Sequence, residues 1–336
     1  MNSRQTRILC LLGLIFTLSA CGSPSSKPSH QMDKTAEVSE NEIKVEVNET
    51  PITSGQLGGL YIDAGDKTPI ILIIPGSGPT DLDGNNPAGI SAATYKLLAH
   101  GLAKDGISTV RVDKRGMFSS EQAGDPNQVS VDIYAKDYSG WVDRIIERTN
   151  APCVYVLGHS EGGLMGSATA RLNKNICGLI LVSAPGRPLS EILKEQLQAN
   201  PANAPLLDEA LDAIAKLETG ERVSTETMHR ALRPLFHDDV QDYLISLINI
   251  DPADLAKSAG IKTLVIHGTT DIQTSVRDAK ILADATGGTL KIIEGINHVL
   301  KKAPENQLLN IRTYGDPDLP ISPEVVEAIA EFVEPK

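Results

Sequence analysis

The sequence has few basic residues, few aromatic residues and no long hydrophobic run. Its 31 Lys and Arg residues are outnumbered by 43 Asp and Glu residues, so the 336-residue chain carries a formal net charge of −12. A protein with this charge is poorly suited to bind nucleic acid or anionic lipid through its surface field. Aromatic residues make up only 4% of the chain, so we expect a substrate pocket to be aliphatic.

The N-terminus carries an apolar run, residues 8–20, that is shorter than the about 20 residues of a membrane-spanning helix. Arg4 and Arg7 precede it, which is typical of a signal peptide over residues 1–20. The run ends at Cys21 in a sequence that resembles the bacterial lipobox, where cleavage precedes a cysteine that is then acylated. We therefore expect an exported protein of the cell envelope, held at a membrane by lipid on Cys21 and facing the periplasm or the exterior. An ordinary signal peptide is the alternative.

Residues 21–41 are rich in Ser, Pro, Lys and Glu and have no periodic apolar positions, as expected of a flexible tether. The remaining cysteines outside the signal, Cys153 and Cys177, each begin an apolar stretch. Buried free thiols are the favoured interpretation of such positions. In an oxidising compartment a disulfide stays open as the alternative.

From residue 42 onward the pattern is that of one α/β domain. Two alternating segments, 43–47 and 57–62, predict an antiparallel lead-in pair with a turn near Ser54 and Gly55. Short continuous apolar runs then alternate with helical stretches, which predicts a mostly parallel sheet with helices on both faces. The expected strands are 70–74, 107–112, 154–157, 176–182, 264–266 and 290–293, and the expected helices are 92–104, 131–149, 160–172, 275–285 and 323–333.

Between the strand at 176–182 and the strand at 264–266 the rhythm breaks. This interval has no convincing strand but several amphipathic stretches, at 189–198, 206–217 and 239–250. We interpret residues of about 187–259 as a helical cap inserted into the sheet domain.

The most informative motif is Gly158-His159-Ser160-Glu161-Gly162, which follows an apolar strand and precedes a helical segment. This is the strand-turn-helix setting of a nucleophile elbow, with Ser160 at the sharp turn. Flanking glycines remove side chains that would clash with the adjacent strand and helix. We therefore expect Ser160 to be a nucleophile.

A serine nucleophile needs a base, and the base needs an acid that orients it. Asp271 lies just past the strand at 264–266, and His298 follows the strand at 290–293, so both fall at the carboxyl edge of the sheet. These two residues are the predicted acid and base. Asp278 and Asp284 fall on a helix, where solvated acids are common, and the other histidines, which include His159 and His267, are interpreted as structural or solvated.

The tetrahedral intermediate also needs two hydrogen-bond donors. One is expected to be the amide of Glu161, directly after the nucleophile, and the other the amide of Ser77, with Gly76 as the alternative, in the glycine-rich turn after the strand at 70–74. This turn lacks the Gly-Lys-Ser/Thr ending of a nucleotide-binding loop. A serine at the elbow, in place of a carboxylate, argues against halide or epoxide hydrolysis.

Together these motifs resemble those of a bacterial branch of capped α/β-hydrolase carboxylesterases related to serine aminopeptidases. The shared residues are the turn 75–85, Asp113-Lys114-Arg115-Gly116, the elbow 158–163, Gly268-Thr269-Thr270-Asp271 and Asn297-His298. The resemblance implies an eight-stranded α/β-hydrolase fold and hydrolysis of a small-molecule ester through an acyl-enzyme, without metal or organic cofactor. Leu82 stands where the branch usually has a basic residue, which bears on substrate preference. Asp113 and Arg115 are interpreted as braces of the elbow loops.

Two other functions stay open at this stage. A serine peptidase of the aminopeptidase kind would use the same triad with an acidic cap residue for the substrate ammonium, and Glu209, Asp212 and Glu218 are candidates. A binding lipoprotein that keeps the fold without turnover is the non-enzymatic alternative.

Overall fold

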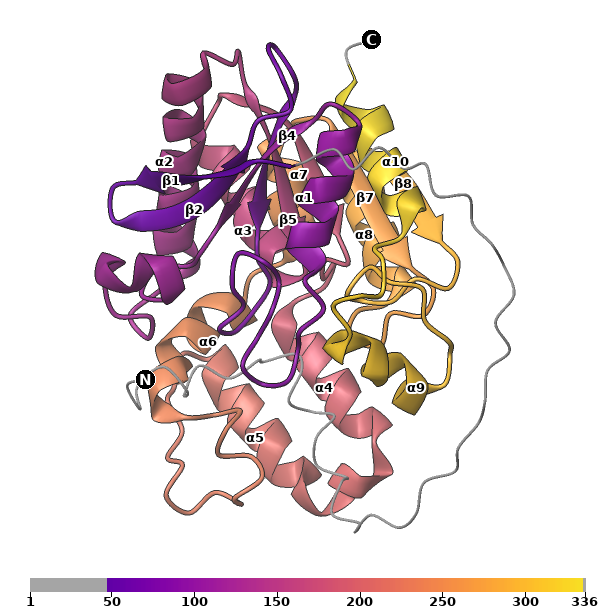
Figure 1. The fold of residues 1–336 in the computed structure, drawn as a ribbon. Helices are drawn as coiled ribbons and strands as arrows, with labels where there is room; N and C mark the ends of the chain where they lie inside the picture. Colours follow the sequence, from indigo (N-terminus) through magenta and orange to yellow (C-terminus); the bar gives the residue numbers. More distant parts are fainter. Residues whose placement is uncertain (1–46, 335–336) are drawn as a thin grey trace.

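The computed structural model describes residues 47–334, and within this range one eight-stranded sheet forms the centre of the molecule (Figure 1). The strand order is β1-β2-β4-β3-β5-β6-β7-β8, with β1, β2 and β4 paired antiparallel and all other neighbours parallel. The expected mostly parallel sheet is thus confirmed. The strands are β1 (Glu49–Ser54), β2 (Leu57–Ile62), β3 (Ile70–Ile74), β4 (Ser108–Val112), β5 (Val154–His159), β6 (Ile176–Val182), β7 (Thr263–Gly268) and β8 (Thr289–Ile293).

Helices cover both faces of the sheet, because the central strands are apolar on both sides. Every residue of β3, β4, β5 and β7 is buried. One apolar core lies between the sheet and helices α1 and α10, and the other lies under α2, α3, α7 and α8. These helices are α1 (Thr94–Lys104), α2 (Val131–Thr149), α3 (Glu161–Leu172), α7 (Pro252–Ala259), α8 (Val276–Thr286) and α10 (Pro323–Val333).

The helical insertion follows β6 and has an apolar core of its own. Figure 1 shows α4, α5 and α6 grouped beyond one end of the sheet, with α9 beside α4. Leu193, Ile214, Phe236 and Leu244 are among the buried residues of this third core. The elements here are α4 (Leu189–Ala199), η4 (Pro201–Leu206), α5 (Leu207–Glu218), η5 (Asp238–Val240) and α6 (Gln241–Ile248), and the remaining short helices of the described chain are η3 (Phe118–Ala123), α9 (Gln307–Arg312) and η6 (Thr313–Gly315).

Two boundaries differ from those expected. Helix α7 falls inside the range of about 187–259 expected for the cap, but it packs against α3 and α8 on the sheet. Asp251, which caps α7, and Pro252 at its first position start a new helix after α6 has ended. The first strand of the described residues is Glu49–Ser54, whereas the range 43–47 expected for it lies outside them except for Val47. Pro51 is tolerated in β1 because β1 is an edge strand.

The signal segment, Cys21, the tether and residues 43–46 lie outside the described residues. Within residues 47–334 no helix is both long and apolar enough to cross a membrane. The lipid anchor therefore stays a prediction.

We expected free thiols at Cys153 and Cys177, and this expectation is wrong: the two residues form a disulfide, with their Cα atoms 5.3 Å apart. Strands β5 and β6 are neighbours, and the pairing shifts from Val154 with Ile176 to Tyr155 with Gly178, so that Cys177 is skipped. The sequence does not reveal which strands are neighbours, so it could not decide between the thiols and the bond. A disulfide persists in oxidising compartments; the expected export stays a prediction.

We expect replacement of both cysteines by alanine to lower the free energy of unfolding by about 3 kcal/mol, because the bond closes a 24-residue loop in the unfolded chain. Urea denaturation with and without a reductant measures this. The reductant should lower the wild-type midpoint to that of the double variant and leave the double variant unchanged. A wild-type midpoint that does not respond to the reductant would contradict the assignment.

Candidate active site

Ser160 lies at a sharp turn between β5, which ends at His159, and α3, which begins at Glu161. Its backbone has φ 55° and ψ −127°, a conformation that non-glycine residues rarely adopt. Such strain persists only where the surrounding structure enforces it, and it clusters at functional sites. The turn therefore has the geometry expected of a nucleophile elbow.

The glycines around Ser160 allow a close approach that a side chain would prevent. A Cβ atom on Gly158 would lie 2.2 Å from the Gly162 carbonyl oxygen, and one on Gly162 would lie 2.5 Å from the Ile74 carbonyl oxygen. Because backbone atoms cannot give way by this much, α3 can start directly against β5 and β3 only with glycine at these positions.

Asp271 and His298 come together at the carboxyl edge of the sheet, from the loops after β7 and β8. The His298 Nδ1 atom lies 2.8 Å from Asp271 Oδ2, and the side chain of Asp271 is fully buried. Asp271 also accepts hydrogen bonds from the amides of Gln273 and Thr274. Burial alone would raise the pKa of Asp271, but the nearby His298 and these hydrogen bonds outweigh it and hold the pKa below its usual value. An ionised Asp271 keeps the proton of His298 on Nδ1 and leaves Nε2 as the acceptor.

One small cavity, with a volume of about 50 Å³, brings the candidate residues together. Ser160, His298 and Ser77 all line it, and Gly76 and Gln273 complete part of the wall. Of the described residues that line this cavity, none is acidic. His229 and His237 of the insertion do not reach it, and Asp278 instead forms a capping box with Ser275 at the start of α8.

The two amides expected to bind an oxyanion are available. Within residues 47–334 neither the Ser77 N–H nor the Glu161 N–H has a hydrogen-bond acceptor. The alternative donor, the Gly76 N–H, is already bonded to the Tyr95 hydroxyl at 2.8 Å. A Cβ on Gly76 would lie 3.2 Å from the Ser160 Cβ, so this loop runs directly beside the nucleophile.

Lys114 holds the same loop from behind, a contact that the sequence analysis did not assign. Its ammonium donates to the Gly76 carbonyl oxygen at 2.6 Å and also to the Gly78 carbonyl oxygen. The positive charge of Lys114 and a hydrogen bond from Tyr243 at 2.8 Å partly offset the effect of burial, which raises the pKa of the Glu161 carboxyl. Lys114 therefore acts on both residues whose amides are available: it holds the loop that contains Ser77, and its charge acts on the Glu161 carboxyl.

The neighbours of Lys114 have different tasks. Asp113 accepts from the Leu82 amide at 2.8 Å and from Ser119, so it braces the loop that follows Ser77. Arg115 pairs with Asp137 in α2 and does not contact the elbow. The expected bracing role thus fits Asp113, whereas Arg115 braces α2.

His159 links three segments of the site through a chain of hydrogen bonds. Its Nε2 donates to the carbonyl oxygen of His298 at 2.8 Å, and its Nδ1 therefore accepts from the Tyr95 hydroxyl at 2.9 Å. Tyr95 in turn accepts from the Gly76 amide. The chain joins the loop of Ser77, the elbow and the loop of His298, and the sequence offered no signal for it beyond the residue types.

Burial, together with the charge of His298, lowers the pKa of His159 to about 3. An unfolded chain takes up this proton near pH 6.5, whereas the folded protein does not until about pH 3. We therefore expect stability to fall as the pH drops through this interval, by about 1.4 kcal/mol per pH unit for this one proton. His159→Gln retains a donor for the His298 carbonyl but has no titrating ring. Between about pH 3 and pH 6.5 its slope of unfolding free energy against pH should therefore be lower than that of the wild type by this amount. An unchanged slope would show that His159 does not titrate in this way.

Comparisons with known proteins agree with this geometry. A family model described as serine aminopeptidase, S33, matches residues 88–230. Esterase EstD of Thermotoga maritima is 29% identical over 240 residues, which cover 69% of this chain and 54% of that protein, so the chain spans about half the length of this relative.

Solved structures show the same fold. Est1E from Butyrivibrio proteoclasticus, with ferulic acid bound, has a TM-score of 0.52 at 16% identity and covers 84% of this chain and 98% of its own. A lipase-esterase related protein from Clostridium acetobutylicum has a TM-score of 0.51 at 19% identity and covers 83% of this chain and 100% of its own. With its sheet order, its elbow and these likenesses, the chain has the α/β-hydrolase fold.

Proposed function

We propose that this protein is a serine carboxylesterase. The observation that carries the proposal is the convergence, on one cavity, of a strained Ser160, a His298 paired with a buried Asp271, and the Ser77 amide, with the Glu161 amide directly after Ser160 in the chain. The likeness to Esterase EstD of Thermotoga maritima supports the same chemistry.

In the proposed mechanism His298 takes the proton of Ser160 while the serine oxygen bonds to the ester carbonyl carbon. Asp271 holds the imidazole in the required tautomer, and the amides of Ser77 and Glu161 bind the oxyanion. The bond to the alcohol oxygen then breaks, and the alcohol leaves with the proton from His298. Water, deprotonated by His298, attacks the acyl-enzyme; the carboxylic acid leaves and Ser160 regains its proton.

An aminopeptidase is the second candidate, because the matching family model carries that description. The acids considered for a substrate ammonium are engaged elsewhere: Asp212 pairs with Lys216, Glu218 pairs with Lys194, and Glu209 accepts from the His229 amide. The cavity at Ser160 has no acidic residue in its described wall. The site therefore favours an uncharged ester over an aminoacyl substrate.

Turnover of p-nitrophenyl acyl esters compared with aminoacyl p-nitroanilides tests the proposal. We expect the esters to be hydrolysed and the anilides to remain at the background rate, because no described residue that lines the cavity at Ser160 is an acid that could bind the ammonium. Labelling of Ser160 by a fluorophosphonate, read by mass spectrometry, separates both enzymes from a binding protein. Preference for the anilides would favour the peptidase, and the absence of labelling and turnover would favour the binding protein.

A further inference from the structure

The cavity at Ser160 is too small for the ester that the proposed function requires. Its volume of about 50 Å³ is far below the about 300–1,000 Å³ that is usual for small-molecule sites. Most of a substrate larger than an acetate ester must therefore lie in a neighbouring space.

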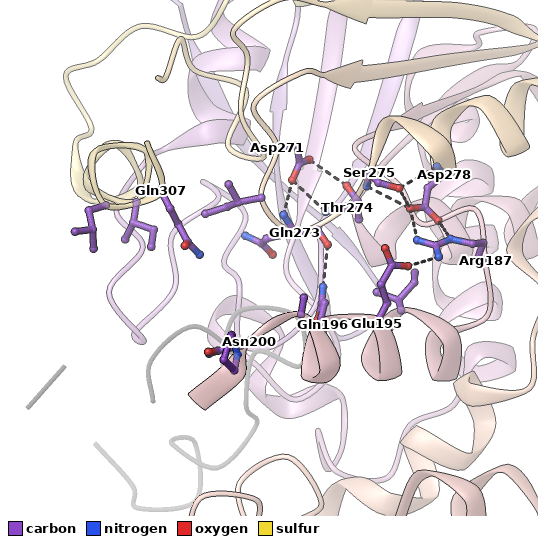
Figure 2. A pocket seen from close by; sticks show the side chains of 16 residues that line it. Arg187, Glu195, Gln196, Asn200, Asp271, Gln273, Thr274, Ser275, Asp278 and Gln307 are labelled. Carbon is purple, nitrogen blue, oxygen red and sulfur yellow. Dashed lines mark hydrogen bonds and ion pairs between the residues drawn. The ribbon is translucent and has the colours of Figure 1, made fainter. Parts of the chain in front are cut away.

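A much larger cleft adjoins this cavity at one shared residue, Gln273. Its volume is about 590 Å³, within the range of about 300–1,000 Å³ that is usual for small-molecule sites. Figure 2 shows its walls: α4 contributes Gln196, the loop after β7 contributes Gln273, and α9 contributes Gln307. Gln273 lines both this cleft and the cavity of Ser160.

Gln273 is fixed through its backbone, while its side chain is held weakly. Its amide donates to Asp271 at 2.8 Å, and its carbonyl accepts from the Gln196 side chain at 3.0 Å. The side-chain amide makes only a long hydrogen bond, 3.5 Å, to the Tyr314 hydroxyl. This side chain can therefore change its rotamer at the boundary of the two spaces without moving the backbone that orients Asp271.

The cleft lies on the side from which the alcohol leaves. In the proposed mechanism His298 protonates the alcohol oxygen, and His298 and Gln273 line the same cavity. A second, small pocket adjoins Glu161 and shares Arg187 and Ile192 with the cleft, and its wall is mostly apolar, including Leu164, Leu189 and Leu247. That aliphatic wall suits the acyl group and leaves the cleft for the alcohol.

The charges of the cleft define which alcohol it can accept. Arg187 is the single cation among its described lining residues, and both Asp278 and Glu195 pair with it, as Figure 2 shows. The third carboxylate of the wall, Asp271, is paired with His298, and the other polar groups are uncharged amides and hydroxyls beside Ile192, Leu308 and Ile311. Because each described charge of the cleft already has a partner of opposite sign, a neutral ligand with hydroxyl or ether oxygens and some hydrocarbon fits best.

We propose that this cleft binds the alcohol portion of the substrate, and that this portion is an extended, uncharged, oxygen-bearing alcohol. The inference rests on the proposed function. Three butyrate esters test it: methyl butyrate, the monobutyrate of triethylene glycol, and the same glycol ester ending in a carboxylate in place of the hydroxyl group.

The decisive variants are a matched pair on α4. Ala199 lines the cleft, whereas its neighbour Gln198 is exposed and does not. We expect Ala199→Trp to raise KM for the neutral glycol ester by about tenfold and to leave kcat/KM for methyl butyrate within about twofold, because only the larger alcohol reaches the cleft. Gln198→Trp should change neither value, and the wild type should prefer the neutral over the anionic glycol ester by about tenfold or more.

Equal effects of Ala199→Trp on the methyl and glycol esters, or no effect on either, would overturn the assignment of the cleft. Equal turnover of the neutral and anionic glycol esters would overturn the assigned alcohol class. In both of these outcomes the wild type still hydrolyses methyl butyrate, so the proposed function stands while the cleft or alcohol assignment fails. If the wild type cleaves none of the esters and a fluorophosphonate does not label Ser160, the proposed function itself fails, and the cleft assignment fails with it.

Discussion

Ser160→Ala is expected to lower kcat for p-nitrophenyl butyrate by about 10⁴-fold or more, the scale of loss seen when a serine hydrolase loses its nucleophile. The methyl group cannot bond to the ester carbonyl, and the hydroxyls of Thr80, Thr94 and Tyr95 in the same cavity wall are hydrogen-bonded to groups other than the His298 ring. The variant keeps the backbone contacts of the elbow, so its thermal unfolding should match that of the wild type.

Ser167→Ala is the matched control. Ser167 lies in α3, the helix that follows Ser160; it is equally buried, and its hydroxyl donates to the Gly163 carbonyl at 2.8 Å. We expect its turnover to stay within about threefold of the wild type, since a neutral hydrogen bond contributes roughly 1 kcal/mol to stability and here touches no reacting atom. The Ser160→Ala protein must be purified free of wild-type protein. Full turnover by this purified variant would rule out the acyl-enzyme mechanism.

The parts of the site that lie close together in the chain could be predicted from the sequence. The apolar strand, the glycines and the helix around Ser160 are consecutive, so one segment contains the whole signal for the elbow. Asp271 and His298 were found because each follows a buried strand of a parallel sheet, and such strands end at one edge. The structure places all three residues at that edge.

Features that depend on which segments are neighbours could not be predicted. The disulfide requires β5 beside β6 with a shift in register. The bond between His159 and the His298 carbonyl joins residues 139 positions apart, and it follows from side-chain orientation alone. Sequence patterns report burial and local conformation, but they do not state which polar groups meet across a fold.

Lys114 is the most consequential of these unpredicted residues. A peptide unit is planar, so holding the Gly76 carbonyl fixes the direction of the Ser77 N–H on the same unit. A cation at the carbonyl oxygen also polarises the unit and makes that N–H a stronger donor. Lys114 therefore acts through Ser77, as a positioning residue for the proposed oxyanion site.

We expect Lys114→Met to lower kcat for p-nitrophenyl butyrate by about 10²-fold, the lower end of the loss from one oxyanion donor, with KM changed by less than about threefold. Affinity for a trifluoromethyl ketone, which forms an oxyanion on Ser160, should fall in step with kcat. Arg115→Met is the control, because Arg115 pairs with Asp137 outside the cavity; it should lower the melting temperature while retaining kcat and ketone affinity. If Lys114→Met behaves in the same way, Lys114 stabilises the fold and takes no part in positioning Ser77.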